Sequence, residues 1–597
     1  MKIRFLAVLT ALVTLLAGNS ALAQWQTQTF TVKPGWTAVY LYVDASYTNL
    51  DYLVGSDPGN PIQEIWMWEP TVSSVQFVTS AQNPITGSSQ WANWERLGTG
   101  LPSTLASLAP NAAFLIHSTA STNYLWKVKG KPVAPSYFWT TTGINFVGFP
   151  TVTNSAPLMD SFLAPVPGLQ SVATFFQYGG GNLSSFNPAQ VFAPHTVTMN
   201  RGQAFWITTP SYANTYFGPF QVVPIGTGAA FGTSFSSTSI RLVNTTLSPV
   251  TIKLSLQPSE LPPPGLATNI GVPPIIVRGA LKSDTLTYAV QNLTATNTLS
   301  WTLAPQGQGG SDIAIILGVN RAAMTNNPGA NFAGILRFTD SLGFTEVNLP
   351  TSAQAGSYAG LWVGNAVLSQ VSNYLKNYQV DANGKPMQDT NGAYVVSSIN
   401  TNLGSVASSA AYPMRLILHN DGTNVNLMQR VFYGSDINSN TIIATGESAL
   451  DPNQLSSARR ITAVQFPWTP NNQSWRFTGS LTPGAVLSTT TTVNYDDYAN
   501  NPFLHTYHPD HDNLDATFQK QLPIGSESYQ FDRQITMSVI APSNDYNSLT
   551  QFGQSFSGAY AETITMTGVG FATRVFNVAG AFTINRISQI PVLTQGH

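Results

Sequence analysis

The feature of this sequence that most constrains its fold is the repetition of short β-strand signals along the chain. Runs rich in Val, Ile, Thr, Phe, Tyr and Trp alternate with polar residues and end at Gly, Pro, Asn or Asp, which is the pattern of half-buried strands. Clear runs occupy residues 37–43, 240–244, 250–256, 415–419 and 573–584. Helical periodicity is scarce, and residues 367–378 are the best helix candidate. The sequence therefore predicts an all-β chain of several modules.

Length and segment pattern divide the chain into a leader and four regions. With about 150 residues per domain as a guide, a chain of 597 residues favours about four domains. We assign a signal peptide to residues 1–23, β module one to 24–135, β module two to 136–224, an immunoglobulin-like sandwich to 225–352 and a C-terminal β-rich domain to 353–597. The predicted architecture is tandem β modules, a sandwich and a β-rich C-terminal region.

The first 224 residues have the pattern of a diverged duplication. Gly-initiated apolar strands at 35–41 and 143–149 open the two copies, and aromatic strands at 66–68 and 176–178 follow. Each copy continues with a small-aromatic-apolar strand, at 113–116 and 204–207, and closes on an aromatic segment near a glycine. The shared order predicts two related β modules.

The third region has the strand spacing of an immunoglobulin-like sandwich with about seven short strands. Residues 239–244 and 250–254 are expected to pair with each other across 245–249. Residues 334–338 are expected to turn through 340–343 into 345–349. Both hairpins would lie within one module.

The fourth region contains two Asp-x-Asn-Gly segments, at residues 381–384 and 389–392. Asn-Gly favours tight hairpin turns because both residues accept a positive φ. A calcium loop of the EF-hand type is the alternative, but the third acidic position and the bidentate glutamate of such a loop are missing. We interpret both segments as hairpin turns.

The N-terminus has the pattern of a secretory signal. Lys2 and Arg4 precede an apolar run, and Ala21-Leu22-Ala23 forms a small-x-small cleavage site, so Gln24 is the expected mature N-terminus. The apolar run is shorter than the roughly 20 residues that span a bilayer. We therefore expect an extracytoplasmic protein, in the periplasm, on the outer surface or secreted, with no transmembrane segment after cleavage.

The composition excludes several classes of function. Only 9% of residues are charged and 43% are hydrophobic, which opposes disorder because disordered chains are poor in apolar residues and rich in charge. Lys and Arg number 25 against 27 Asp and Glu, so a nucleic-acid partner, which needs a basic surface, is not expected. The chain has 0 cysteines, which rules out disulfides, thiol nucleophiles and thiolate metal sites.

One stretch, residues 496–515, carries a constellation of metal-ligand type. It contains three of the 7 histidines and five of the aspartates. Imidazole and carboxylate groups bind zinc and other divalent metals, and carboxylates suit calcium. The candidate ligands are His505, His508, Asp510, His511 and Asp512, with zinc or calcium as the cofactor. The alternative is a polar loop whose Asp and Asn side chains cap turns.

The tryptophans are the other functional candidates, because nine of the 13 lie in residues 25–206. Trp66 and Trp68 are two apart on a predicted strand and share one face, and Trp91 and Trp94 lie close in sequence. As exposed rings, these four could stack on a sugar ligand. As buried rings, they would form the cores of the two β modules, because large aromatics bury the most area.

Several segments resemble recurring stretches of a known kind of protein. These are Gly-Trp-x-x-Val-Tyr-Leu at 35–41, Arg-Phe-Thr-Asp-Ser at 337–341, Arg-Leu-Ile-Leu-His at 415–419, and residues 501–513 and 580–586. They are similar to segments of large, uncharacterised, secreted β-rich modular proteins of environmental Gram-negative bacteria that carry an immunoglobulin-like module. The resemblance implies export and a modular β fold, and it implies no activity.

Together these features favour a secreted, non-enzymatic surface or matrix protein that binds, adheres or scaffolds, with a glycan or a protein at the cell surface as partner. One alternative is a metal-dependent or glycan-processing hydrolase that uses the 505–515 loop or an acidic pair such as Glu64 with Glu69 or Glu95. A second alternative is an outer-membrane β-barrel, which would need strands of about ten residues with an apolar outer face.

Overall fold

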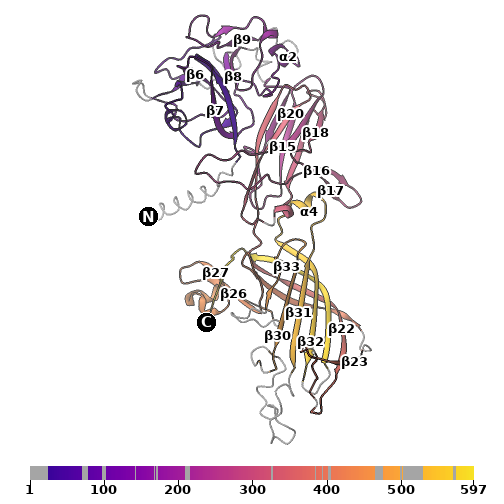
Figure 1. The fold of residues 1–597 in the computed structure, drawn as a ribbon. Helices are drawn as coiled ribbons and strands as arrows, with labels where there is room; N and C mark the ends of the chain where they lie inside the picture. Colours follow the sequence, from indigo (N-terminus) through magenta and orange to yellow (C-terminus); the bar gives the residue numbers. More distant parts are fainter. Residues whose placement is uncertain are drawn as a thin grey trace. The chain divides into compact units, whose positions relative to one another are not determined.

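The computed structural model describes residues 24–69, 78–96, 103–140, 143–166, 169, 173–208, 216–324, 327–383, 385–392, 394–400, 405–463, 475–495, 497, 501, 529–568 and 573–596. The chain forms two compact units. The first consists of Met1–Gly356 with Asn544–Phe552, and the second of Ser357–Ser543 with Gly553–His597. Both are built almost entirely from β-sheets (Figure 1), which confirms the all-β prediction.

The first module of the first unit contains two sheets. One has the order β2-β6-β4-β5, and the other the order β1-β7-β3. The strands are β1 (Gln26–Val32), β2 (Gly35–Leu41), β3 (Val43–Asp44), β4 (Ile62–Trp68), β5 (Trp91–Glu95), β6 (Ala112–Ser118) and β7 (Tyr124–Pro132), with a π-helical turn at Asp51–Gly55. Residues from both sheets, among them Phe30 and Trp126 of one and Phe114 and Ile116 of the other, form one core.

The second module repeats the strand order of the first. Its sheet has the order β8-β11-β9-β10, in which each strand takes the place of its counterpart in β2-β6-β4-β5. The elements are β8 (Ile144–Gly148), α2 (Met159–Leu163), β9 (Thr174–Gln177), β10 (Ala189–Gln190), a 3₁₀ turn (Pro194–Thr196) and β11 (Ala204–Thr208). The matching topology supports tandem, related modules.

The two modules share one aromatic core. Trp66, Trp68 and Trp91 from the first module and Phe146 and Trp206 from the second belong to the same buried cluster. The ring centroids of Trp68 and Trp206 lie 4.9 Å apart, and those of Phe146 and Trp206 lie 4.4 Å apart. Aromatic pairs at such spacings add to the burial energy of the rings, so the modules are packed against each other as one body.

Residues beyond the second module form a β-sandwich. One sheet has the order β12-β14-β19-β16-β17 and the other β13-β21-β20-β15-β18. The strands are β12 (Phe220–Pro224), β13 (Ala229–Ala230), β14 (Ser237–Asn244), β15 (Val250–Pro258), β16 (Ile275–Lys282), β17 (Thr287–Asn292), β18 (Leu299–Leu303), β19 (Asp312–Val319), β20 (Asn331–Asp340) and β21 (Glu346–Gln354), with a 3₁₀ turn at Arg321–Met324. The two sheets enclose a single core.

The expected pairing of residues 239–244 with 250–254 is wrong. β14 pairs with β12 and β19, whereas β15 pairs with β18 and β20 in the facing sheet. The linking segment crosses between the sheets, and the Asn244 side chain holds it by donating to the carbonyls of Ser248 and Ala304, both at 2.8 Å. The alternating apolar residues of both strands then reach one core from opposite sides. The β20–β21 hairpin is confirmed.

The second unit is dominated by one large sheet with the order β29-β25-β24-β22-β33-β32-β31-β30, and β23 pairs with β22. Its long strands run side by side in Figure 1. The strands are β22 (Gly360–Tyr378), β23 (Val396–Asn400), β24 (Ser405–Asn420), β25 (Val425–Leu427), β29 (Arg476–Phe477), β30 (Val486–Val493), β31 (Gln530–Val539), β32 (Ser555–Thr567) and β33 (Thr573–Ser588). Along β32 buried and exposed residues alternate from Ser555 to Glu562, so the sheet has a buried and an exposed face.

The helix candidate at residues 367–378 is also wrong, because these residues lie within β22. β22 pairs along its length with β33 on one edge and with β24 on the other. A backbone that is hydrogen-bonded on both edges stays extended whatever the local periodicity of its side chains, because tertiary context overrides local propensity.

Smaller elements complete both units. A four-stranded sheet of the second unit has the order β28-β26-β27-β34; its strands are β26 (Arg430–Ser435), β27 (Thr441–Ala444), β28 (Arg459–Thr462) and β34 (Leu593–Thr594), beside 3₁₀ turns at Glu447–Ala449 and Pro452–Ser457. Helix α4 (Tyr546–Thr550) packs in the first unit, where a Cβ on Gly318 would collide with the side chains of Tyr546 and Thr550.

The two Asp-x-Asn-Gly segments begin with Asx turns. The Asp381 carboxylate accepts a hydrogen bond from the Asn383 amide, and the Asp389 carboxylate accepts one from the Asn391 amide.

Candidate functional site

The four tryptophans singled out as sugar-stacking candidates are buried. Trp66, Trp68, Trp91 and Trp94 are 3%, 7%, 5% and 2% exposed. The first three belong to the core shared by the two modules, and Trp94 belongs to the core of the first module, where its indole N–H donates to Asp51 Oδ1 at 2.8 Å. A sugar ring could reach these faces only if the sheets opened, so packing is the role that their positions support.

The candidate metal ligands His505, His508, Asp510, His511 and Asp512 lie outside the described residues. Among the residues that the structure describes, no group of three or more His, Asp or Glu side chains is placed to hold a metal ion. Zinc or calcium binding by the 505–515 loop therefore stays a prediction.

The acidic pair Glu64 and Glu95 is brought together by the strand register. The two residues are directly opposite each other on β4 and β5, where Cβ atoms are about 5 Å apart. Glu64 Oε1 lies 3.2 Å from His117 Nδ1 on β6, and Glu64 Oε2 accepts from the Trp66 indole at 2.9 Å. The Trp36 ring stacks on the His117 ring with centroids 4.7 Å apart. Sequence reasoning considered the carboxylates and missed the histidine.

A cavity of about 590 Å³ in the first unit is lined by aromatic side chains. It lies between the segment that follows β7 and the strand β12. Tyr137 and Trp139 are both half-buried and pack edge to face, with centroids 4.9 Å apart at an interplanar angle of 77°. Phe217 packs edge to face with Trp139, with ring centroids 6.4 Å apart. The remaining lining residues are Pro110, Asn111, Val133, Ala134, Pro135, Ser136, Gln221, Val222, Val223, Pro224, Gly226 and Thr227.

Hydrogen bonds hold the aromatic wall of this cavity in place. Asn111, in a left-handed conformation with φ 55°, donates from its side chain to the Ala134 carbonyl at 2.9 Å and accepts from the Ser136 amide at 3.2 Å. The Tyr40 hydroxyl donates to the Ser136 carbonyl at 3.0 Å. Asn tolerates this backbone region better than most residues. A surface fixed before a ligand arrives loses little entropy on binding.

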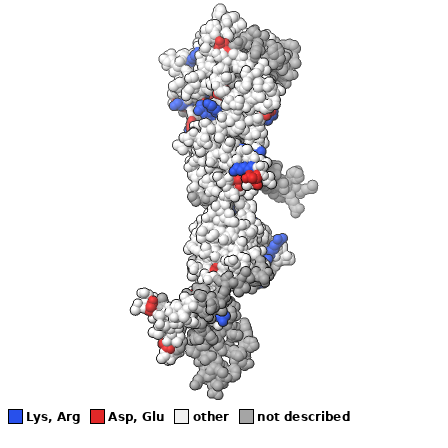
Figure 2. Space-filling model, turned by 90° about the vertical axis from the view of Figure 1, so that its right-hand side faces the viewer, with Lys and Arg blue, Asp and Glu red and all other residues white. Residues whose placement is uncertain are grey.

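The cavity is chemically neutral, because no Lys, Arg, Asp, Glu or His belongs to its lining. Burial raises the pKa of Tyr137, so its phenol stays protonated, and its oxygen accepts from the Phe146 amide at 3.1 Å. Among the described residues, the Trp139 indole N–H has no hydrogen-bond partner within the protein. Figure 2 shows few charged side chains among the described residues on the face that it draws. Aromatic faces with a few polar groups are typical of small-molecule and saccharide pockets.

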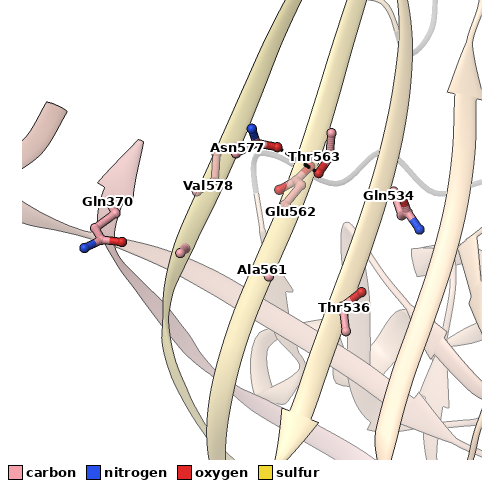
Figure 3. Close-up of a pocket in the computed structure, with 9 residues that line it drawn as sticks. Gln370, Gln534, Thr536, Ala561, Glu562, Thr563, Asn577 and Val578 are labelled. Carbon is pink, nitrogen blue, oxygen red and sulfur yellow. Dashed lines mark hydrogen bonds between the residues drawn. The ribbon is translucent and has the colours of Figure 1, made fainter. Parts of the chain in front are cut away.

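A second hollow, of about 410 Å³, lies on the large sheet of the second unit (Figure 3). Its rim carries amide and hydroxyl side chains from four strands, and its floor carries alanines. The lining residues are Gln370, Gln534, Thr536, Ala561, Glu562, Thr563, Asn577, Val578 and Ala579. Glu562 is buried and its side chain points to the opposite face of the sheet by strand alternation.

On that opposite face, Glu562 belongs to a buried polar network. Its Oε1 accepts from Arg533 Nε at 2.5 Å, and its Oε2 accepts from the Tyr560 hydroxyl at 2.8 Å. The Arg533 guanidinium lies 5.6 Å from the centroid of the Trp475 ring. The carboxylate is therefore used inside the unit and adds no charge to the hollow.

Sequence reasoning missed both hollows. The signal for the first was the segment Pro135-Ser136-Tyr137-Phe138-Trp139, which joins three aromatic residues outside any strand pattern. The second had no sequence signal, because its residues come from β22, β31, β32 and β33 and meet only through the sheet register.

Comparison with known proteins assigns no family. No helix in the described part of the chain combines the length and the apolar character needed to cross a membrane. A scan against protein-family models finds no model that matches the chain, and a search of curated proteins finds no match.

Proposed function

We propose that this chain is an exported binding protein that holds a neutral glycan in the aromatic cavity of its first unit. The single observation that carries the proposal is the half-buried edge-to-face pair of Tyr137 and Trp139, which lines an uncharged cavity. Pyranose rings present apolar C–H faces that stack on aromatic rings and hydroxyls that need polar partners. Asn111, Ser136 and Gln221 offer such partners around the rings.

Two further observations support binding over catalysis at this cavity. Its lining has no carboxylate, imidazole or amine that could act as a general acid or base. The fixed backbone of the Asn111–Ser136 region suits recognition by a preformed surface. The signal peptide expected at residues 1–23 supports export to where cell-surface and environmental glycans occur.

Affinity gel electrophoresis of the mature protein, residues 24–597, tests the proposal. Gels contain one soluble neutral polysaccharide each: a β-glucan, an α-glucan or a galactomannan. We expect the protein to migrate more slowly in at least one of them. Trp139→Ala should lose about fivefold or more of the affinity, if a sugar gains from the ring the roughly 1–3 kcal/mol that a nucleobase gains by stacking on an aromatic side chain.

Phe138→Ala is the matched control. Phe138 is the neighbour of Trp139 and is 67% exposed, but it does not line the cavity. It should bind like the parent protein. Equal migration of the parent, Trp139→Ala and Phe138→Ala in every gel would overturn the proposal.

A glycan-processing activity at Glu64 and Glu95 is a second candidate function, and the β4–β5 register favours it. Retaining glycosidases place two carboxyl groups about 5–5.5 Å apart, which opposite positions on neighbouring strands can provide. Release of reducing ends from the same polysaccharides, lost in Glu64→Gln and in Glu95→Gln, would support it. Absence of released sugar over the whole panel would contradict it.

A further inference from the structure

The hollow on the large sheet of the second unit is built by the strand register. Thr536, Ala561, Ala579 and Gln370 are opposite one another on consecutive strands β31, β32, β33 and β22. In the next row, Gln534, Thr563 and Asn577 are opposite one another. Residues that are opposite in an antiparallel sheet point to the same face, so seven side chains surround one depression.

The two alanines explain why a depression exists. They separate Thr536 from Gln370, and these two residues are three strand spacings apart, which is about 14 Å. The longer side chains of Gln534, Thr563 and Asn577 stand beside the gap. Figure 3 shows Gln370 on one side and Gln534 with Thr536 on the other side of the strand that carries Ala561. The width of the gap suits a pyranose ring.

The rim offers hydrogen-bonding groups that the protein itself uses only in part. Thr563 donates to Asn577 Oδ1 at 3.1 Å. Among the described residues, the side-chain amides of Gln370 and Gln534 have no protein partner. Amides and hydroxyls both donate and accept, which matches ligands that are rich in hydroxyl groups.

The chemistry of the rim also excludes other ligand classes. Nucleic acids and other polyanions require Lys or Arg, and none lines the hollow. Protein interfaces are centred on aromatic residues, Met and Arg, and these are absent from the lining as well. A neutral, hydroxyl-rich ligand remains the class that fits.

We propose that this hollow is a second site for a neutral saccharide, so that the chain carries one saccharide site in each of its two units. The inference rests on the proposed function for the nature of the ligand, but it concerns a different site, formed by other residues. Two sites on one chain raise its apparent affinity for a polysaccharide that engages both.

The test uses the full mature protein and the same three polysaccharide gels. Ala561→Phe fills the hollow from an exposed strand position, and Ser555→Phe is its control on the exposed face of the same strand, outside the lining. We expect Ala561→Phe and Trp139→Ala each to reduce retardation, their combination to abolish it, and Ser555→Phe to behave like the parent.

The outcomes separate the two proposals. If Ala561→Phe binds like the parent while Trp139→Ala loses all binding, the second site is refuted and the proposed function stands. If Trp139→Ala has no effect while Ala561→Phe abolishes binding, the second-unit site stands and the cavity is not the binding site. If Ser555→Phe weakens binding as much as Ala561→Phe, the effect is not specific to the hollow and the inference is refuted. Unchanged thermal midpoints confirm that each variant is folded.

Discussion

Replacement of Glu562 by Gln tests the buried network that stabilises the second unit. The Glu562 and Arg533 side chains are 3% and 12% exposed, and the Tyr560 hydroxyl also bonds to the carboxylate. Glu562→Gln keeps the shape and the Tyr560 contact but removes the charge that compensates Arg533. Breaking a buried pair in this way costs about 3–5 kcal/mol. In a unit of this size, that cost lowers the melting temperature by roughly 6–20 °C.

Urea and thermal unfolding of the parent, of Glu562→Gln and of the double variant Arg533→Met/Glu562→Leu measure the cost. Because the chain has two units, its unfolding can show two transitions. The transition that Glu562→Gln shifts is assigned to the second unit. The double variant should recover only part of the loss, because apolar replacements of a buried pair are often neutral, whereas the buried Tyr560 hydroxyl loses its acceptor. An exposed ion pair contributes at most about 1 kcal/mol to the free energy of unfolding. A decrease of less than that in Glu562→Gln would show that the pair behaves like a surface pair and would refute its role as a buried network.

Three more predictions concern other parts of the molecule. Asp340→Ala removes the carboxylate that accepts from the amides of Leu342, Phe344 and Thr345 in the β20–β21 turn, so we expect a loss of about 1–3 kcal/mol in urea unfolding, and an unchanged midpoint would contradict the role of the turn. Burial lowers the pKa of His419 below its ordinary 6.5. As the pH falls, this histidine is therefore protonated in the unfolded chain before it is protonated in the folded one, so the free energy of unfolding should decrease below about pH 6.5. The decrease should be less steep in His419→Leu. Elemental analysis should find about one zinc or calcium per parent chain and none when all three loop histidines, 505, 508 and 511, are changed to Ala, and metal-free parent protein would dismiss that site.

The sequence contained enough to predict the strands and too little to predict their partners. Alternation at residues 240–244 and 250–256 predicted two strands, and both exist as parts of β14 and β15. Their pairing was wrong because a strand with one apolar face can bury it from either sheet of a sandwich, and alternation does not distinguish the two. The tandem modules were easier to predict, because two copies of one strand pattern indicate that both copies have the same strand order.

The candidate sites depended on information that local patterns lack. The burial of Trp66 and Trp206 follows from the stacking of two modules, which no single strand reveals. Tyr137 and Trp139 are half-buried in a segment between strands, and a segment without alternation gives no strand signal. The hollow around Ala561 depends on registers among four strands that are far apart in sequence.

Saturation-transfer NMR of a neutral oligosaccharide on the mature protein tests the central claim most directly. The oligosaccharide is cut from the polysaccharide that retards the protein most. We predict transfer to the sugar C–H protons of one ring face, reduced in Trp139→Ala and preserved in Phe138→Ala, because the rings of Tyr137 and Trp139 form the binding surface. Transfer that is absent, or that is the same in Trp139→Ala as in the parent, would contradict the account.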